Sequence, residues 1–320
     1  MPRAVNSKHI SILLLLYNGE KYINDAYVGS IIKNTKVPGY AIDFVFLDNG
    51  STDNTVSKVL KQYPMVHLLK TFKNTLYGEG VNTLIRYAYR TYKSDYFIIF
   101  DQDAKAPAGY ASALVQFATQ HPEAAFVQPL ILNGPKNNDI YSAGHRYVGK
   151  TKSCFPLQHT KPHRRYSEIK SGSIMGTLLK AEAVKEVGVL DPIFEIYYES
   201  SDWCFRFRKA GYKCYCLYEA IVYHERDQKK SSNLQLYYVF RNKIILWAKH
   251  DTATYQACRA EYQRELDSLT TAYSTGRLVN NSYDQMKHFA LSDGVALAAQ
   301  ATRKRNTSIK FQPFSCVHAK

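Results

Sequence analysis

The sequence predicts an α/β fold, in which a mostly parallel sheet carries helices on both faces. Four short apolar runs have the length and composition of buried strands, at residues 10–16, 42–47, 66–69 and 96–100. Three segments with the features of helices lie between them, at about residues 20–33, 53–62 and 77–92. A regular alternation of strand and helix is typical of such a sheet.

The pattern continues as far as residue 223. We expect a helix at 108–120, a strand at 126–132, a loop-rich rim segment or flap at 133–166, a small-residue turn at 171–177 that leads into a helix, a second helix at 200–211 and a strand at 213–223. From residue 233 onward, three amphipathic helices replace the alternation, at about 234–249, 254–273 and 284–303. We therefore divide the chain into a domain of residues 1–228 and a helical extension of residues 229–320.

The composition limits the classes of protein to which the chain can belong. Its 320 residues carry a net charge of +15, which favours acidic partners such as phosphorylated substrates or anionic lipid. The basic residues are scattered and form no recognisable binding module, so nucleic acid is not expected as a partner. Six cysteines without a C-x-x-C pair predict a reducing compartment. No apolar run approaches the roughly 20 residues of a spanning helix, so any membrane contact is expected to be peripheral.

Two carboxylates stand at the end of the strand at residues 96–100. Asp101 and Asp103 follow it directly, with Gln102 between them. Open α/β sheets bind ligands at the carboxyl ends of their strands, so both acids can converge on one cation there. Carboxylate oxygens suit Mg²⁺ or Mn²⁺, which commonly bridge to substrate phosphates. An Asp-x-Asp pair alone is a weak signal, and a plain surface loop is the competing interpretation.

A second acidic cluster begins the helix expected at residues 200–211. Glu199 and Asp202 lie together at its N-terminal end, where the helix dipole stabilises acids and a purely structural cap is a fair alternative. Asp202 and Arg206 are four residues apart and can form an ion pair, whereas Trp203 belongs to the buried stripe. One carboxylate here can act as a general base on an acceptor hydroxyl. His224, after the last strand, is a candidate third ligand for the cation.

Polar turns also follow other strands of the predicted sheet. Asp48 ends the second strand, where it can hydrogen-bond a base or ribose, or simply close a helix-capping turn. Turns that open helices expose backbone N–H groups at one rim, which favours anions such as nucleotide phosphates. Neither G-x-G-x-x-G nor G-x-x-x-x-G-K-[ST] occurs, which argues against a dinucleotide fold and a P-loop ATPase.

Together these segments resemble the inverting glycosyltransferases of family 2, which have the GT-A fold. The matching pieces occur in the family's order between residue 8 and about residue 250: Tyr17-Asn18, residues 48–53, Asn74 with Gly78, Gly80 and Asn82, residues 101–103, Ser171-Gly172 with Gly176, residues 188–191 with Phe194, residues 199–206, Gly211-Tyr212, His224 and Arg241-Asn242. Residues 100–103 and 202–206 look most like the rhamnosyltransferase branch that builds bacterial surface polysaccharides.

The resemblance implies a role for each matching residue. Tyr17, Asn18, Asp48, Asn82, Asp101 and Gln102 would bind the nucleotide-sugar, Asp101, Asp103 and His224 would hold Mg²⁺ or Mn²⁺, and Gly172, Ser173 and Trp203 would contact the acceptor. Residues 1–228 would then be the nucleotide-sugar-binding and catalytic domain, and residues 229–320 would face the acceptor or the membrane. The cation would stabilise the departing diphosphate.

One position departs from the family pattern. Members usually have Glu-Asp where this chain has Glu199-Ser200, and the Asp is their base. Ser200 has no carboxylate, so we expect Asp202 to be the base, with Glu199 as the other candidate and Arg206 beside them. A catalytically degenerate protein that only binds a nucleotide-sugar or a glycan is the alternative.

The resemblance thus implies an inverting transfer from a nucleotide diphosphate-sugar, such as dTDP-rhamnose or a UDP-hexose, to a saccharide hydroxyl. The product would serve bacterial cell-surface polysaccharide assembly, of O-antigen or capsule. The basic charge fits a lipid-linked or oligosaccharide acceptor beside an anionic membrane. We therefore expect a cytoplasmic enzyme at the inner face of the plasma membrane.

Overall fold

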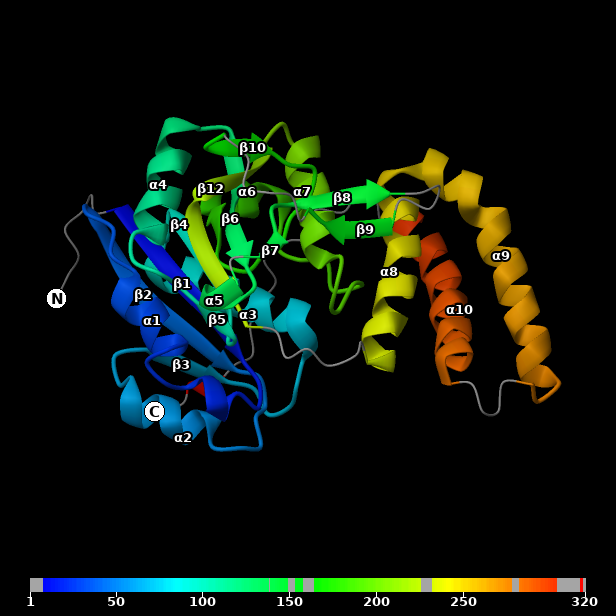
Figure 1. Cartoon of the computed structure of the whole chain (residues 1–320), viewed down its shortest axis with the longest axis horizontal. Coiled ribbons are helices and arrows are strands. Elements are labelled where there is room, and N and C mark those ends of the chain that lie inside the picture. The colour runs from blue at the N-terminus through cyan, green and yellow to red at the C-terminus, as the bar shows by residue number, and fades with distance from the viewer. Residues whose placement is uncertain are drawn as a thin grey trace.

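The computed structural model describes residues 8–137, 139–148, 153–157, 164–225, 232–277, 282–303 and 317–318. A twisted sheet forms the centre of the larger part of the molecule, and three long helices stand beside it (Figure 1). The predicted α/β fold with a C-terminal helical extension is confirmed. The flap expected at residues 133–166 lies partly outside the described residues.

Parallel strands form the first half of the sheet. They are β1 (Lys8–Leu16), β2 (Tyr40–Asp48), β3 (His67–Lys70) and β4 (Tyr96–Asp101), and the short β13 (Val317–His318) lies antiparallel to β3. β1 pairs with both β2 and β4, so that Leu16 lies opposite Asp48 and Leu15 opposite Asp101. The carboxyl ends of these strands therefore meet at one edge of the sheet, where a ligand site was predicted.

An antiparallel strand separates the two halves of the sheet. β11 (Thr177–Lys180) lies between β4 and β6 (Ala124–Leu132) and is antiparallel to both. The sequence predicted a turn leading directly into a helix here, and instead α6 (Ala181–Val187) begins only after β11. β12 (Lys213–His224) is parallel to β6, and β10 (Tyr166–Glu168) follows it at the edge. The strand order is β10-β12-β6-β11-β4-β1-β2-β3-β13.

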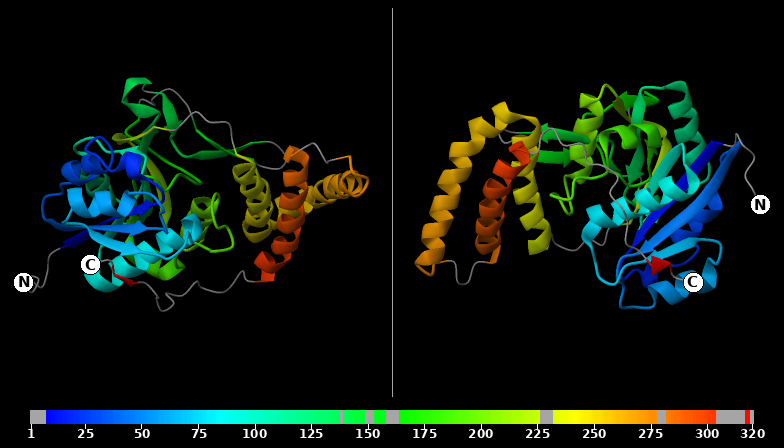
Figure 2. Two further views of the ribbon diagram at one scale, coloured as in Figure 1. Left: turned by 90° about the horizontal axis from the view of Figure 1, so that it is seen from below. Right: turned by 180° about the vertical axis from the view of Figure 1, so that it is seen from behind.

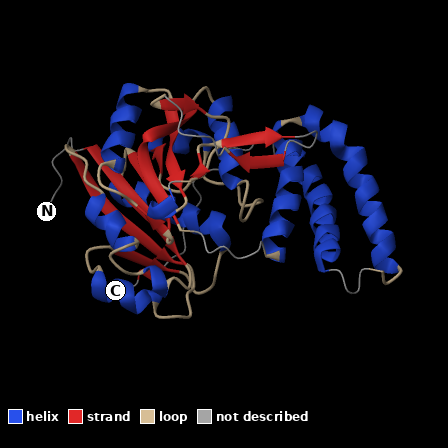
Figure 3. Ribbon diagram, in the orientation of Figure 1, coloured by secondary structure: helices blue, strands red, loops and turns tan. Residues whose placement is uncertain are grey.

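Helices cover both faces of the sheet (Figure 3). α1 (Val28–Asn34), α2 (Thr55–Gln62) and α4 (Tyr110–Gln120) contribute to the core on one face, and α3 (Leu76–Tyr92), α6 and α7 (Glu199–Lys209) to the core on the other. The single helix expected at residues 20–33 is interrupted, because only η1 (Glu20–Tyr22) and α1 are helical. Between them the side chain of Asn24 accepts a 2.9 Å hydrogen bond from Ala26 N–H and closes a turn.

Short elements surround the ends of β6 and β12. β5 (Ala104–Lys105) pairs with β12, α5 (Gly134–Asn137) follows β6, and β7 (Ile140–Ser142) pairs with β6. A hairpin of β8 (His145–Val148) and β9 (Ser153–Pro156) reaches toward the helical extension (Figure 2). There the ring of Tyr147 packs edge-on against Trp247, with 5.0 Å between the ring centroids.

The extension consists of α8 (Asn233–His250), α9 (Thr252–Ser274) and α10 (Ser282–Arg303). Its core includes Ile244, Trp247 and Leu291, and it is completed by Phe194 and Tyr198 from the loop that precedes α7. The extension is therefore packed onto the rim of the sheet domain. None of the helices in the described part of the chain combines the length and the apolarity that crossing a bilayer requires.

Candidate active site

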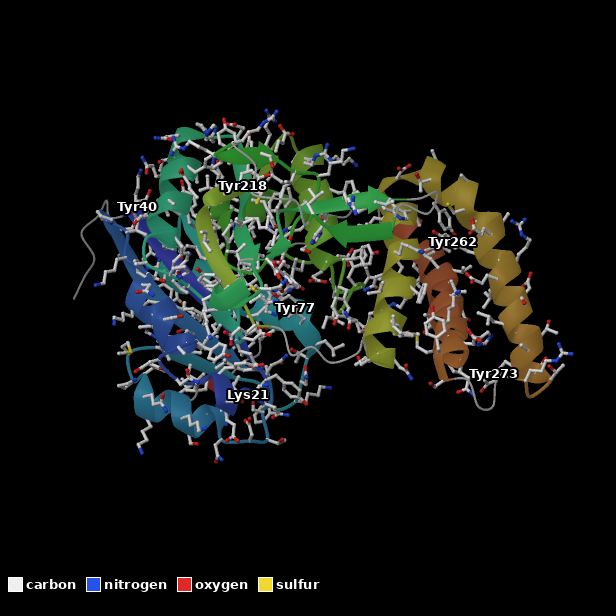
Figure 4. All side chains as sticks on the ribbon, viewed as in Figure 1. Lys21, Tyr40, Tyr77, Tyr218, Tyr262 and Tyr273 are labelled. Atoms are coloured by element: carbon white, nitrogen blue, oxygen red, sulfur yellow. The ribbon has the colours of Figure 1, made fainter. Side chains whose placement is uncertain are left out.

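A pocket of about 620 Å³ lies where the carboxyl ends of β1, β4 and β12 meet α7 and α8. Asp101, Asp103, Glu199 and His224 all line it, so the structure brings together the two acidic clusters that the sequence singled out. Tyr77 lines the same pocket, and Figure 4 shows it between the sheet and the extension.

Asp101 ends β4 in surroundings that favour its protonated form. Burial raises the pKa of its carboxyl to about 6, and the charge of Asp103 adds to the shift. The hydroxyl of Tyr77 donates a 2.8 Å hydrogen bond to Asp101 Oδ1. A cation beside both carboxylates would lower this pKa again, because positive charge stabilises the ionised form.

Asp103 and His224 are neighbours in the pocket wall. Asp103 Oδ2 lies 3.0 Å from His224 Nε2, and His224 Nδ1 has no hydrogen-bond partner in the described part of the chain. Among these residues no three His, Cys, Asp or Glu side chains form a ready-made metal site. The chemistry of the donors still suits a divalent ion, since carboxylate oxygens are ligands of Mg²⁺ and Mn²⁺.

The negative charge of the pocket also favours a bound cation. Its lining includes the three carboxylates Asp101, Asp103 and Glu199, and none of its described lining residues is Lys or Arg. A diphosphate would meet a surface of its own sign there unless a cation intervened. The Lys and Arg side chains of the described residues therefore lie outside the pocket lining.

Glu199 is the first residue of α7, and its side chain is buried in the pocket wall. Burial raises the pKa of its carboxyl to about 7, to which the charges of Asp101 and Asp202 also contribute. Its Oε2 atom has no hydrogen-bond partner among the described residues. A desolvated carboxylate with one unpartnered oxygen beside a cavity is chemically suited to accept a proton from a bound ligand.

Asp202 is engaged elsewhere. It is fully buried and does not line the pocket. Its Oδ2 accepts a 2.7 Å hydrogen bond from Arg206 Nε, and its Oδ1 lies 2.6 Å from Lys249 Nζ and 2.7 Å from His250 Nε2. Burial alone would raise the pKa of this carboxyl, but the charges of Arg206 and Lys249 and the hydrogen bond from His250 hold it well below its usual range. Of the two carboxylates that the sequence offered as base, the structure thus places Glu199, and not Asp202, in the pocket wall.

Two further candidate residues of α7 are structural. Arg206 donates to the carbonyl oxygens of Val187 and Val189 at 2.7 and 2.8 Å, besides its pair with Asp202. Trp203 is fully buried, and its Nε1 donates a 2.9 Å hydrogen bond to the carbonyl oxygen of Gly188. Neither lines the pocket, and both brace the turn after α6.

The small-residue turn contributes one of its two candidates to the pocket. Ser173 lines the pocket, and its backbone N–H donates a 2.7 Å hydrogen bond to Gln128 Oε1. Gly172 does not line it, and a Cβ at this position would lie 2.3 Å from Gln128 Oε1. Close packing, rather than contact with an acceptor, therefore explains Gly172.

The candidates for nucleotide binding divide in a similar way. Tyr17 and Gln102 line the pocket and exchange hydrogen bonds between the Gln102 amide and the Tyr17 backbone, at 3.0 and 3.1 Å. Asp48, at the end of β2, is buried with an unpartnered Oδ2 among the described residues, but it does not line the pocket. Asn18 Oδ1 accepts a 2.8 Å hydrogen bond from Thr52 N–H, which braces that rim.

Asn82 has no polar atom left for a ligand. Its Nδ2 donates to the carbonyl oxygen of Leu190, and its Oδ1 accepts from the N–H of the same residue, both at 2.9 Å. The side chain is fully buried and lies outside the pocket lining. Asn82 thus forms a bridge between α3 and the segment that follows α6.

The pocket also contains residues that the sequence did not single out. His145 of β8 lines it, and burial lowers the pKa of this imidazole to about 4, so that it is neutral near pH 7. Its Nδ1 lies 3.3 Å from Ser171 Oγ. Gln235 and Val239 of α8 line the opposite part of the wall. No local motif marks these positions, because only tertiary packing brings the hairpin and the extension to the sheet.

Sequence comparisons identify a family and related proteins. The model of the family "Glycosyl transferase family 2" matches residues 11–188. The N-acetylglucosaminyl-diphospho-decaprenol L-rhamnosyltransferase of Mycobacterium tuberculosis (strain ATCC 25618 / H37Rv) is 26% identical over 226 residues, which cover 63% of this chain and 71% of that protein.

Solved structures share the fold. GalNAc-T7 with UDP, GalNAc and Mn²⁺ matches with a TM-score of 0.62 and 14% identity, over 90% of this chain and 59% of that one, so this chain spans less than two thirds of GalNAc-T7. The mannosyltransferase PcManGT from Pyrobaculum calidifontis, in complex with GDP-Man and Mn²⁺, matches with a TM-score of 0.53 and 14% identity, over 94% and 88% of the two chains. These likenesses confirm the GT-A fold. Since the family model covers more than half of the chain, this protein belongs to glycosyl transferase family 2, as its motifs predicted.

Proposed function

We propose that this enzyme transfers a sugar from a nucleotide diphosphate-sugar to a hydroxyl group of a saccharide, with inversion at the anomeric carbon. One observation carries the proposal: a single pocket contains a buried carboxylate with an unpartnered oxygen among the described residues, Glu199, and a pair suited to a cation, Asp103 and His224. Direct displacement of a diphosphate requires a base and a positively charged group close together.

Glu199 is the base in this proposal. Its carboxylate takes the proton of the acceptor hydroxyl while that oxygen bonds to the anomeric carbon and the bond from this carbon to the diphosphate breaks. A carboxyl whose pKa is about 7 is well matched to proton transfer near neutral pH. The neutral imidazole of His145 can hydrogen-bond a sugar hydroxyl without adding charge.

Asp101, Asp103 and His224 are the proposed ligands of Mg²⁺ or Mn²⁺. When bound, the ion supplies positive charge that stabilises the departing diphosphate. Tyr17 and Gln102 would contact the nucleotide from the same part of the pocket. The Mn²⁺ and the nucleotide or nucleotide-sugar in the two structural relatives support this assignment.

The proposed donor is dTDP-rhamnose or a UDP-hexose, and the proposed acceptor is a lipid-linked or oligosaccharide glycan of a bacterial cell-surface polysaccharide such as O-antigen or capsule. The name of the mycobacterial relative supports a diphospho-lipid-linked acceptor and a rhamnosyl donor. The net charge of +15 supports peripheral contact with anionic lipid, and hence work at the cytoplasmic face of the plasma membrane.

A thermal-shift screen of UDP-, dTDP- and GDP-sugars, each with and without Mn²⁺, tests the donor. Ligand at about 100 times its Kd stabilises the native state by about 2.7 kcal/mol, which is a readily measured rise in melting temperature. We expect one nucleotide class to raise it, and only with Mn²⁺. The absence of any shift across the panel would contradict the proposal.

Ser200 favours a second candidate function, a protein that binds the nucleotide-sugar without transferring it. Product analysis separates the two. Donor that is bound tightly but never consumed, across a panel of lipid-linked and free oligosaccharide acceptors, would favour the binding protein. Inverted product, absent in a Glu199→Gln variant, would favour the enzyme.

A further inference from the structure

The loop at residues 193–198 forms part of the pocket wall and runs directly into Glu199. Ile196, Tyr197 and Tyr198 line the pocket. Three of the loop residues have a left-handed backbone, with φ of 58° at Glu195, 65° at Tyr197 and 68° at Tyr198. Side chains with a Cβ disfavour this conformation, so contacts from outside the loop are needed to maintain it.

Asn242 of α8 supplies such contacts. Its Nδ2 lies 2.7 Å from the carbonyl oxygen of Phe194 and 2.8 Å from those of Ile196 and Tyr197. Three acceptors around one atom identify it as the amide nitrogen, because only the nitrogen donates. The side chain is fully buried, so these hydrogen bonds are shielded from water on the side of Asn242.

Neighbouring residues hold the same loop. The hydroxyl of Tyr238 donates a 2.5 Å hydrogen bond to Glu195 Oε2, and Arg241 NH1 lies 3.4 Å from the same atom. From α3, Gly78 N–H donates to the Glu195 carbonyl oxygen at 2.8 Å. The loop is thus fixed between α8 and the start of α3.

We propose that Asn242 is a positioning residue, which holds the 193–198 loop in its left-handed form and thereby sets both the acceptor side of the pocket and the orientation of Glu199. The effect on catalysis rests on the proposed function, whereas the effect on the loop does not. Asn242 itself does not line the pocket, so it acts only through the backbone that it binds.

Hydrogen–deuterium exchange of the full chain tests the effect on the loop. Asn242→Leu keeps a similar volume and removes the donor, and Tyr238→Phe removes a single contact in case the first variant does not fold. Leu114→Ala is the matched control, since it opens the core on the far face of the sheet, which contains no residue of the 193–198 loop. We expect at least about tenfold faster exchange at residues 194–199 in the loop variants, but not in the control. Equal exchange in variants and control would overturn the proposal.

Steady-state kinetics tests the consequence. We expect the loop variants to lower kcat by about 100-fold and to raise KM for the acceptor, because small displacements of a catalytic group have effects of this size. Donor binding with Mn²⁺, followed by thermal shift, should stay within about threefold of the wild type. Faster loop exchange with unchanged kcat and acceptor KM would refute the positioning role. If the wild type itself turns over no donor, the proposed function fails, and the exchange experiment still decides whether Asn242 holds the loop.

Discussion

Lys249 Nζ, near the end of α8, lies 2.6 Å from Asp202 Oδ1 on α7. Asp202 is fully buried and Lys249 nearly so, and the contact joins the helical extension to the helix that begins with Glu199. The guanidinium of Arg206 and the imidazole of His250 complete the set of partners around this carboxylate. The acidic cluster of α7 therefore divides its tasks, with Asp202 holding the architecture and Glu199 facing the pocket.

We predict that Asp202→Asn lowers the free energy of unfolding by about 3–5 kcal/mol, because it leaves buried cations without their counter-charge. Urea denaturation of the purified variant measures the loss. Folded variant should keep kcat within about tenfold of the wild type, since Asp202 makes no contact with the pocket. A fully stable variant without turnover would restore Asp202 as the base.

The ion pair between Asp202 and Lys249 also makes the stability of the protein depend on pH in the acid range. Since the folded-state pKa of Asp202 lies below its ordinary value of 3.8, its contribution is fully present above about pH 4 and is lost as the pH falls further. Melting temperatures of wild type and Asp202→Asn should differ by a constant amount above about pH 4, and the difference should shrink progressively as the pH falls from about 4 toward 2. A constant difference over this range would show that the ion pairs contribute little.

Glu199→Gln should lower kcat by about 100- to 10,000-fold, the usual contribution of a general base. Donor binding should persist, because the amide preserves the shape of the side chain. Glu182→Gln is the matched control, as it removes a carboxylate whose side chain is 75% exposed. Single-turnover assays with excess enzyme measure the chemical step. Retained turnover in Glu199→Gln would eliminate this residue as the base.

The pH dependence of kcat should follow the ionisation of Glu199. Because burial raises its pKa to about 7 and the base must be ionised, we expect kcat to rise as the pH increases through about 7. The raised pKa of Glu199 has the opposite effect on the stability of the fold. Between pH 4.5 and about 7 the folded state binds more protons than the unfolded state, so the free energy of unfolding falls as the pH rises. The rise of kcat with pH should be absent in the Glu199→Gln variant. A flat profile from pH 5.5 to 8 would contradict the assignment.

Asp103→Asn and His224→Gln should each weaken Mn²⁺ binding and lower turnover by about 100-fold or more, since a Lewis acid contributes several kcal/mol and each 1.36 kcal/mol is tenfold in rate. Calorimetric titration with Mn²⁺ and donor measures the binding. Excess chelator should abolish turnover in the wild type, and added Mn²⁺ should restore it. Full activity of Asp103→Asn with chelator present would exclude a role for the ion.

Trp203→Phe should lower the free energy of unfolding without changing KM for the acceptor. The change removes the indole hydrogen bond to Gly188 and opens a small cavity, with an expected loss of about 1–3 kcal/mol. Chemical denaturation measures this loss. KM for the acceptor should be unchanged, because the ring lies outside the pocket. A raised KM in a fully stable variant would return Trp203 to the acceptor site.

Sequence reasoning recovered the parts of the fold that local patterns determine. The strands that end at Leu16, Asp48 and Asp101 are marked by continuous apolar runs, and the gathering of Asp101, Asp103 and His224 follows from the rule that strand ends share one edge. β11 was missed because four residues between a small-residue turn and a helix carry no periodicity of their own.

The candidate site was less predictable, for a physical reason. Glu199 and Asp202 have the same chemistry and lie one helical turn apart, so the sequence cannot tell which of them is bound by Lys249 and His250. Likewise Asn82, Trp203 and Gly172 match family motifs although they bind the backbone or fill tight space. A motif indicates that a residue type is needed at a position. Only the packing of the folded chain shows whether that residue contacts a ligand or another part of the chain.

Gln235 and Val239 belong to the extension, yet they line the same cavity as the acids of the sheet domain. On the proposed assignment, the two ends of the chain recognise different reactants. A chimaera that carries the α8–α10 segment of another family member should then exchange its choice of glycan while keeping its choice of nucleotide, so that new linkages can arise by recombination near residue 228.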